Sequence, residues 1–252
     1  ELLPTGGGQN AVDFVATGTL ASGQAVILKT DGTVAAITGV TEGAGTPVVF
    51  ENARSDSCSA VYDSSNNKVV ITYTDLGNSY YGTAVVGTVS GASISFGTPV
   101  VFESATVNAT TATFDSNLNK VVIAYGDGGN SYYGTSIVGT VSGTSISFGT
   151  AVVFENASAT NLGSTFDSNR NRVVLSFRDV GNSNKGTAVV GTVSGTSISF
   201  FTAVVFETAA VSGNTAPVFD TANNKVVISY KDNGNSSYGT AIVGTVSGTS
   251  IS

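Results

Sequence analysis

Short apolar runs separated by small polar clusters dominate the chain. In residues 105–156 the runs are rich in Val, Ile, Phe and Tyr, and Gly, Asn, Asp and Ser bound each of them. This pattern predicts β-strands joined by tight turns. Val121, Val122 and Ile123 are consecutive, and a strand covered on one face only would alternate with polar residues, so we expect sheets covered on both faces. The predicted strands are 111–115, 120–125, 134–141 and 145–154, with a turn at 116–119 and a bend at Gly149.

The same pattern repeats along the chain. A segment Gly-Thr-Pro/Ala-Val-Val-Phe begins at Gly45, Gly97 and Gly149, and a variant of it begins at Phe201, each time 52 residues further on. A second marker, Asp-x-Gly-Asn-Ser, has a last interval of 53 residues, which predicts one inserted residue near 211–214. This second marker begins at Asp75, Asp127, Asp179 and Asp232.

Four-stranded units of this length are typical of β-propeller blades. We therefore predict an all-β fold, a propeller of five blades, with an open β-repeat array as the alternative. Residues 16–32, 33–40 and 47–50 fit the strands of a degenerate first unit, as is expected of a terminal repeat. The predicted divisions are an N-terminal arm at 1–10, a degenerate blade at 11–52, blades at 53–104, 105–156 and 157–208, and an incomplete blade at 209–252.

The composition of the chain argues against two kinds of binding partner, nucleic acid and the membrane interior. The net charge is −7, His is absent, and the 10 Lys and Arg residues are scattered, whereas binding of nucleic acid needs a basic surface. No apolar run has the length of a transmembrane helix. We therefore expect neither nucleic acid binding nor membrane insertion. Cys58 is the single cysteine, so an internal disulfide is excluded.

The Asp-x-Gly-Asn-Ser loops are the first candidate site. An Asp that accepts hydrogen bonds from turn amides and a Gly at positive φ form an ordinary turn, and we expect this structural role for Asp75, Asp127, Asp179 and Asp232. The alternative is a shallow polar site for sugar or calcium in each unit. Calcium takes six or more oxygens, usually from several carboxylates, so one Asp in each loop predicts no metal site.

A second set of polar residues forms the turn between the first and second predicted strands of each unit. Asp followed by a turn that ends in Asn-Lys or Asn-Arg is common hairpin chemistry, and we expect a structural role for it. The residues are Asp63, Asp115, Asp167 and Asp220, with Asn67, Asn119, Asn171 and Asn224.

Tyrosines beside the Asp-x-Gly-Asn-Ser loops are the best candidates for a binding surface. They lie between polar residues, and Tyr next to Asn is typical of recognition surfaces; the same rings could instead fill gaps between units. If they bind sugar, Tyr80, Tyr132 and Tyr238 should occupy equivalent shallow pockets. The candidate ligand-binding residues are Tyr80, Tyr81, Tyr132, Tyr133, Tyr238, Asn78, Asn130, Asn182 and Asn235.

Residue types for catalysis are sparse. His, the commonest general base, is absent, and Cys58 has no base to activate it. The carboxylates recur at fixed places in every unit, whereas a catalytic pair needs two different environments. We therefore expect no catalytic residues, no cofactor and no enzyme.

Two resemblances bear on this expectation. The Asp-x-Gly-Asn-Ser loops resemble in part the Asp-box of sialidase-type propellers, Ser-x-Asp-x-Gly-x-Thr-Trp, but Trp is absent and Thr83, Thr135, Thr187 and Thr240 lie too far along the chain. In that family the box is a structural hairpin, and catalysis uses an arginine cluster with a Tyr and an acid. This chain has only Arg54, Arg170, Arg172 and Arg178.

The second resemblance is to virion-associated tail or fibre proteins of marine tailed phages. It is carried by residues 12–23 and 28–34, by Asn-Lys-Val-Val-Ile-x-Tyr, and by Gly-Thr-Val-Ser-Gly-Thr-Ser-Ile-Ser-Phe-Gly-Thr. It implies a structural or host-recognition role on a virion or outside the cell. We expect a structural or adhesion module that binds a surface glycan or a partner protein. The alternative is a fibre subunit that joins its copies by strand exchange between terminal repeats.

Overall fold

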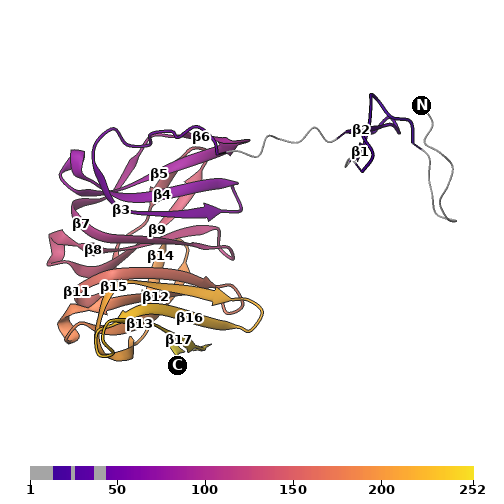
Figure 1. Ribbon diagram of the computed structural model, residues 1–252. Helices are drawn as coiled ribbons and strands as arrows, with labels where there is room; N and C mark the ends of the chain where they lie inside the picture. The colour runs from indigo at the N-terminus through magenta and orange to yellow at the C-terminus, as the bar shows by residue number, and fades with distance from the viewer. Residues whose placement is uncertain (1–13, 24–25, 37–43) are drawn as a thin grey trace. The chain divides into compact units, whose positions relative to one another are not determined.

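The computed structural model describes residues 14–23, 26–36 and 44–252, and the chain forms two compact units, 1–45 and 46–252 (Figure 1). In the first unit, β1 (Val26–Leu28) pairs antiparallel with β2 (Val34–Ala36). The strand predicted at 33–40 contains β2, and residues 47–50, predicted as a strand, are not one. The predicted arm at 1–10 lies outside the described residues. The structure thus places a division between Gly45 and Thr46.

The second compact unit consists of four repeats of antiparallel strands. In an interior repeat the predicted strands 120–125 and 134–141 are observed with extensions of one or two residues, because the β-branched runs end at the same Asn, Asp and Gly residues. The predicted strand 111–115 is only the end of a strand that begins at Val100, and the predicted strand 145–154 is interrupted at 149–151, so these two predictions were wrong in their bounds. The strands are β3 (Ser55–Asp63), β4 (Lys68–Asp75), β5 (Tyr81–Ser90), β6 (Ser93–Phe96), β7 (Val100–Asp115), β8 (Lys120–Asp127), β9 (Tyr133–Ser142), β10 (Ser145–Phe148), β11 (Val152–Asp167), β12 (Arg172–Asp179), β13 (Lys185–Ser194), β14 (Ser197–Phe200), β15 (Val204–Asp220), β16 (Lys225–Asp232), β17 (Tyr238–Gly244), β18 (Val246–Ser247) and β19 (Ser250–Ile251).

The long strands β7, β11 and β15 each belong to two repeats. The first half of β7 pairs with β5 of the preceding repeat, and its second half pairs with β8 of the following one. A bulge lies in the second half of each long strand, and in β15 it contains Gly213, Asn214 and Thr215, one residue more than in β7 or β11. The predicted insertion is therefore confirmed as a larger bulge. The predicted blade boundaries after residues 104, 156 and 208 fall inside these strands, whereas the one after residue 52 precedes β3.

The sheet formed by these strands is open. Its order starts at β17 and ends at β3, and these two edge strands are not paired with each other in the described residues. The repeats that contain them lie at opposite ends of the array (Figure 1). The five-bladed closed propeller is therefore not what the described residues form, because the first-unit hairpin adds no blade to this sheet.

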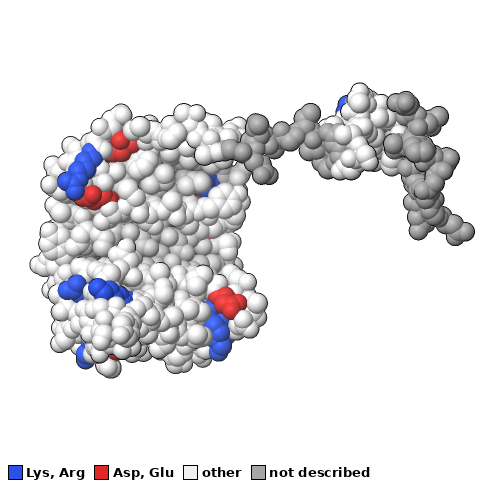
Figure 2. All heavy atoms as spheres, in the orientation of Figure 1, with Lys and Arg blue, Asp and Glu red and all other residues white. Residues whose placement is uncertain are grey.

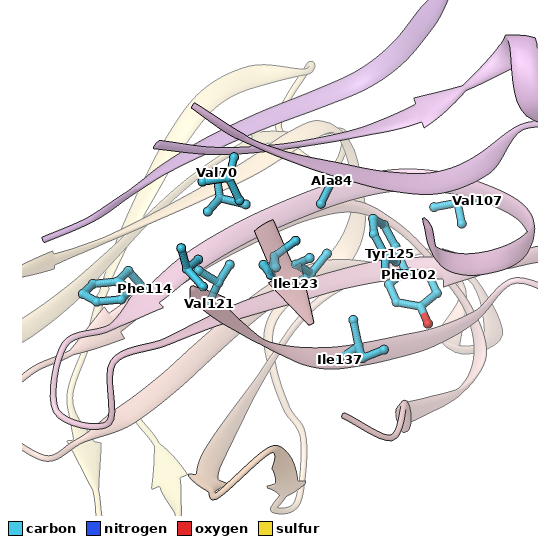
Figure 3. Packing of buried hydrophobic residues seen from close by; sticks show 12 residues of the cluster. Val70, Ala84, Phe102, Val107, Phe114, Val121, Ile123, Tyr125 and Ile137 are labelled. Atoms are coloured by element: carbon cyan, nitrogen blue, oxygen red, sulfur yellow. The ribbon is translucent and has the colours of Figure 1, made fainter. Parts of the chain in front are cut away.

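Each interior repeat packs both of its faces against neighbours. In β8, Val121 and Ile123 join the cluster of the preceding repeat, together with Val70 and Ala84 (Figure 3). Val122, the intervening residue, joins the cluster of the following repeat. Successive side chains of a strand point to opposite faces, so the run of consecutive apolar residues fills two interfaces. This confirms that the strands are covered on both faces.

An aromatic contact connects each repeat to the Val-Val-Phe segment before it. Phe102 packs its ring 5.1 Å from Tyr125 and 5.8 Å from Phe148, both in the following repeat. Phe50 makes the same contacts with Tyr73 and Phe96, at 5.2 and 5.9 Å. Edge-to-face and tilted aromatic pairs add stability beyond their buried area. Residues 46–51 therefore act as the first connecting segment of the array.

Charged side chains are few on the surface. Figure 2 shows one face of the molecule, on which Lys and Arg and Asp and Glu lie in a few separate groups. Across residues 14–23, 26–36 and 44–252, none of the helices has both the length and the apolar character that crossing a membrane requires.

Candidate functional site

The Asp-x-Gly-Asn-Ser loops connect the second strand of each repeat to the third. Three of them contain a short 3₁₀ turn, η1 (Leu76–Asn78), η2 (Gly128–Asn130) and η3 (Val180–Asn182). In each loop the first Asp accepts a backbone amide through its Oδ1 atom. Asp75 accepts from Asn78 N at 3.1 Å, Asp127 from Gly129 N at 2.8 Å, Asp179 from Asn182 N at 3.0 Å and Asp232 from Gly234 N at 2.8 Å.

The glycine of each loop does not have the expected positive φ, which occurs instead at the loop tip. It is required by close contact with the segment that leads into the repeat. A Cβ atom on Gly77 would lie 2.4 Å from the Cβ of Ala53, and one on Gly181 would lie 2.4 Å from that of Ala157. No side chain fits at such a separation. The loop backbone therefore packs directly against the segment that precedes the first strand pairing of the repeat.

Two consecutive residues at the tip of each loop have left-handed backbone conformations. In the first loop φ is 55° at Ser79 and 62° at Tyr80. Such values cost free energy in residues other than glycine, and a bond from the next repeat offsets that cost: Val107 N donates to Tyr80 O at 2.9 Å. Equivalent bonds join Ala159 N to Tyr132 O and Val211 N to Asn184 O. The neighbouring repeat thus fixes the tips of the first three loops.

The tip residue projects into solvent in the first two repeats. Tyr80 is 51% exposed and Tyr132 is 40% exposed. Asn184 and Ser237 have the same place in the third and fourth repeats. Arg178 Nε donates to Asn184 Oδ1 at 2.8 Å, so the third tip has a different chemistry from the first two.

Tyr238 is not the equivalent of Tyr80 and Tyr132. It pairs with Asp232 as Tyr81 pairs with Asp75 and Tyr133 with Asp127. Tyr81 and Tyr133 are half-buried, whereas Tyr238 is 62% exposed. The expected set of three equivalent tyrosines was therefore wrong. The loop asparagines Asn78, Asn130 and Asn235 are exposed and Asn182 is half-buried.

The turns at the other end of the second strand have a structural role. Asp63 is buried, and its Oδ1 accepts from Ser65 N and Asn66 N, each at 3.0 Å. Asn67 closes this turn with φ at 52°. Ser65 Oγ donates to Asn119 Oδ1 of the next repeat. The turns therefore connect to one another along the array.

Buried phenol–carboxylate pairs accompany the aromatic contacts. Tyr73, Tyr125 and Tyr230 donate their hydroxyls to Glu51, Glu103 and Glu207 at 3.0–3.1 Å. Burial, followed by the hydrogen bond to Glu207, raises the pKa of Tyr230 to about 12. Burial likewise raises the pKa of Tyr73 and Tyr125 well above the ordinary value of 10.0. The pairs stay in their hydrogen-bonded, protonated form at neutral pH and act as inter-repeat contacts.

The arginines do not form a cluster. Arg54 pairs with Asp56 at 3.1 Å and Arg170 with Asp167 at 3.4 Å, whereas Arg172 Nε donates to Gly248 O at 3.1 Å. In the described part of the chain, no three Cys, His, Asp or Glu side chains meet to hold a metal ion.

Comparison with known proteins gives no family for this chain: no family model matches it, and no curated protein does. Solved structures are similar to it at low identity, and among them are two trans-sialidases and a sialidase. An intramolecular trans-sialidase from Ruminococcus gnavus in complex with oseltamivir carboxylate is 11% identical, with 66% of this chain and 36% of that chain covered and a TM-score of 0.48. A leech intramolecular trans-sialidase complexed with 2,7-anhydro-Neu5Ac is 11% identical, with 68% of this chain and 27% of that chain covered and a TM-score of 0.49.

The third similar structure is the Hadza microbial sialidase Hz136, which is 12% identical over 76% of this chain and 44% of that chain, with a TM-score of 0.48. This chain thus spans less than half the length of each of the three. All three are enzymes, and this finding contradicts the expectation that the chain is no enzyme, which is withdrawn. A likeness this distant assigns no activity.

Proposed function

We propose that this protein binds glycans at the surface of a virion or a cell, through its Asp-x-Gly-Asn-Ser loops. The observation that carries the proposal is the fixed left-handed tip of the first two loops, which holds Tyr80 and Tyr132 out in solvent. A rigid exposed ring loses little entropy on binding and offers its face to the apolar side of a sugar.

The neighbouring asparagines supply polar contacts. Asn78 and Asn130 precede the tips by two residues and are exposed, and an amide both donates and accepts hydrogen bonds, as sugar hydroxyls do. Equivalent loops in adjacent repeats favour a ligand with repeated sugar units, because two weak contacts on one chain combine into stronger binding. The resemblance to phage virion proteins supports the proposed location.

The test replaces the tip tyrosine by the residue that the third repeat has at that place. Tyr80→Asn and Tyr132→Asn together preserve the left-handed backbone, since Asn tolerates it well. On a glycan array we expect the unaltered chain to bind a discrete set of glycans. The double variant should lose about tenfold or more in affinity, which corresponds to about 1.4 kcal/mol.

The control is Tyr62→Ser, which removes an exposed tyrosine of β3 that donates to Asn67 at 2.8 Å rather than lying on a loop tip. It should bind glycans as the unaltered chain does. Equal binding by the double variant, or no binding by any form of the protein, contradicts the proposal.

A further inference from the structure

We propose that the third Asp-x-Gly-Asn-Ser loop binds an anionic group of an acidic polysaccharide, through the guanidinium of Arg178. The proposal rests on the proposed glycan-binding function and names the class of glycan. This loop joins β12 to β13, and β13 pairs with β12 on one side and with β15 of the next repeat on the other. Both neighbours of the loop are therefore present in the chain.

The first observation is a change of charge at this loop. The third repeat has Arg178, Asn184 and Lys185 where the second repeat has Gly126, Tyr132 and Tyr133. The loop thus exchanges two aromatic rings for two positive charges and an amide. Lys and Arg side chains lie over the part of the array that contains the third and fourth repeats (Figures 1 and 2). Because the chain has a net charge of −7, positive groups at one loop are a local feature.

The second observation is that the side chain of Arg178 is fixed at the loop tip. Its Nε atom donates to Asn184 Oδ1 at 2.8 Å. Asn184 has a φ of 63° and is fixed in turn, because Val211 N of the next repeat donates to its backbone oxygen at 2.9 Å. A guanidinium that is already oriented loses less entropy when it binds a partner.

The third observation is that this bond uses only one nitrogen of the guanidinium. In the part of the chain that the structure describes, the two terminal nitrogens of half-buried Arg178 have no hydrogen-bond partner, and its charge has no ion pair. The other arginines of this repeat differ. Arg170 pairs with Asp167 at 3.4 Å, and Arg172 donates to Gly248 O and to backbone oxygens of its own turn. Arg178 therefore keeps a charge that a partner from outside can neutralise.

The free terminal nitrogens define the kind of group that fits. Parallel N–H donors of one guanidinium match the two oxygens of a carboxylate and those of a phosphate, and a sulfate ester offers oxygens in the same arrangement. A charge-assisted hydrogen bond is about twice as strong as one between neutral groups. The third loop should therefore select, by charge, among the glycans that the first two loops bind.

The succession of the loops favours a polysaccharide over a small anion. The tip residues Tyr80, Tyr132 and Asn184 are each bonded to the repeat that follows, so the three tips succeed one another along the array at intervals of one repeat. A small anion would contact Arg178 alone. A linear chain of sugars can contact the tyrosine rings and place an anionic group on Arg178, and contacts made by one chain combine into tighter binding.

The test uses a glycan array that carries each acidic glycan beside a neutral partner, which is the methyl ester of a carboxylate or the dephosphorylated or desulfated form. The unaltered chain should bind the acidic members about tenfold or more tightly than their neutral partners. The pairs at which this preference appears distinguish carboxylate, phosphate and sulfate. Arg178→Thr, which introduces the residue that the first repeat has at this place, Thr74, should bind both forms equally.

The matched control is Arg170→Asn, which removes the same charge from the turn at the other end of β12. The first and fourth repeats have asparagine at this place, where Asn66 and Asn223 donate to Asp63 and Asp220. Both substitutions thus take a residue from another repeat, and far-UV circular dichroism should show an unaltered fold for each. Arg170→Asn should retain the preference for acidic glycans.

Tyr80→Asn with Tyr132→Asn separates this inference from the proposed function. The double variant should weaken the binding of acidic and neutral partners by the same factor, because the rings do not select by charge. Equal binding of acidic and neutral partners by the unaltered chain overturns the inference and leaves the proposed function standing, and so does a preference that Arg178→Thr retains. Binding of no glycan by the unaltered chain overturns both.

Discussion

The third repeat lacks the buried tyrosine that the other repeats have at the end of their second strand. Glu51, Glu103 and Glu207 each accept a tyrosine hydroxyl, but the third repeat has Phe177 where the others have Tyr. Burial, and secondly the charge of Asp179, raise the pKa of Glu155 above its ordinary value of 4.5. The folded protein therefore holds the Glu155 proton to higher pH than the unfolded chain does. This carboxyl lowers stability as pH rises from 4.5 through its raised pKa.

Phe177→Tyr should restore the missing bond. The new hydroxyl can donate to Glu155, and we expect about 1 kcal/mol of added stability at neutral pH, the usual net value of one hydrogen bond. Urea unfolding at acidic and at neutral pH measures it, and the gain should be larger above the raised pKa of Glu155, where the carboxyl is ionised. The gain should vanish when Glu155→Ala is present. A gain that persists there would contradict this explanation.

The tyrosine pairs predict loss of stability in alkali. In the folded protein the pKa of Tyr230 is about 12, and those of Tyr73 and Tyr125 are also raised, against 10.0 for a free tyrosine. The unfolded chain therefore loses these protons first. The stability that the pairs contribute is complete below pH 10 and falls as pH rises toward the raised values.

Tyr125→Phe tests this dependence on pH. It should cost about 1–3 kcal/mol at neutral pH, because Glu103 loses its donor, and it should make the fall in thermal midpoint above pH 10 less steep. Tyr62→Phe, at an exposed position, is the comparison and should leave the slope unchanged. Equal slopes for Tyr125→Phe and the unaltered chain would show that the pair does not control the alkaline transition.

At the scale of the element, the third strand of each repeat depends on a glycine that lies under an aromatic ring. A Cβ atom on Gly134 would lie 2.5 Å from Phe154 Cε2 and 3.0 Å from Ala159 Cβ. Gly134→Ala should therefore destabilise the protein by about 1–3 kcal/mol, the usual cost of overpacking. Chemical denaturation of the dilute protein measures it. Gly239→Ala, in open space, should cost far less, and equal costs would contradict this account of the ring contact.

Strands and turns were predictable because their signals are local. The Val-Val-Ile run and the Asp–Asn turn appear in residues 115–123 themselves, and the structure follows them. That the fourth strand of one repeat continues into the first strand of the next was not predicted, since the change of partner within β11 occurs without Gly or Pro between Glu155 and Leu162. Whether the sheet closes depends on the twist of the whole array, which no single repeat encodes.

The candidate site was predicted in part. The four loops were found because their marker residues recur, but their tips depend on backbone bonds from the next repeat, such as Val107 N to Tyr80 O, and these are not visible in one loop. Counting residues from the Asp of each loop would have shown that Tyr238 corresponds to Tyr81 and not to Tyr80. Tyr238 and Tyr81 each lie six residues after their Asp, whereas Tyr80 lies five residues after it.

At the scale of the whole molecule, stability should decrease toward the last repeat. An interior repeat packs on two neighbours, and the last packs on one, so its opening breaks fewer contacts. In hydrogen exchange of the dilute chain, amides of β16 and β17 should exchange faster than those of β8 and β9, whose sequences are similar. Uniform protection across the array would show that it unfolds as one cooperative unit.

The sharing of long strands between repeats has a consequence for how such a chain can change in evolution. The strands β7, β11 and β15 cross from one repeat to the next. The residue at which a repeat is said to begin is therefore arbitrary, because no break in the structure marks it. Unequal recombination between two gene copies that keeps the 52-residue period can therefore occur at any codon and still restore every junction. The copy number of the repeat, and with it the length of the array, is free to vary without redesign of any contact.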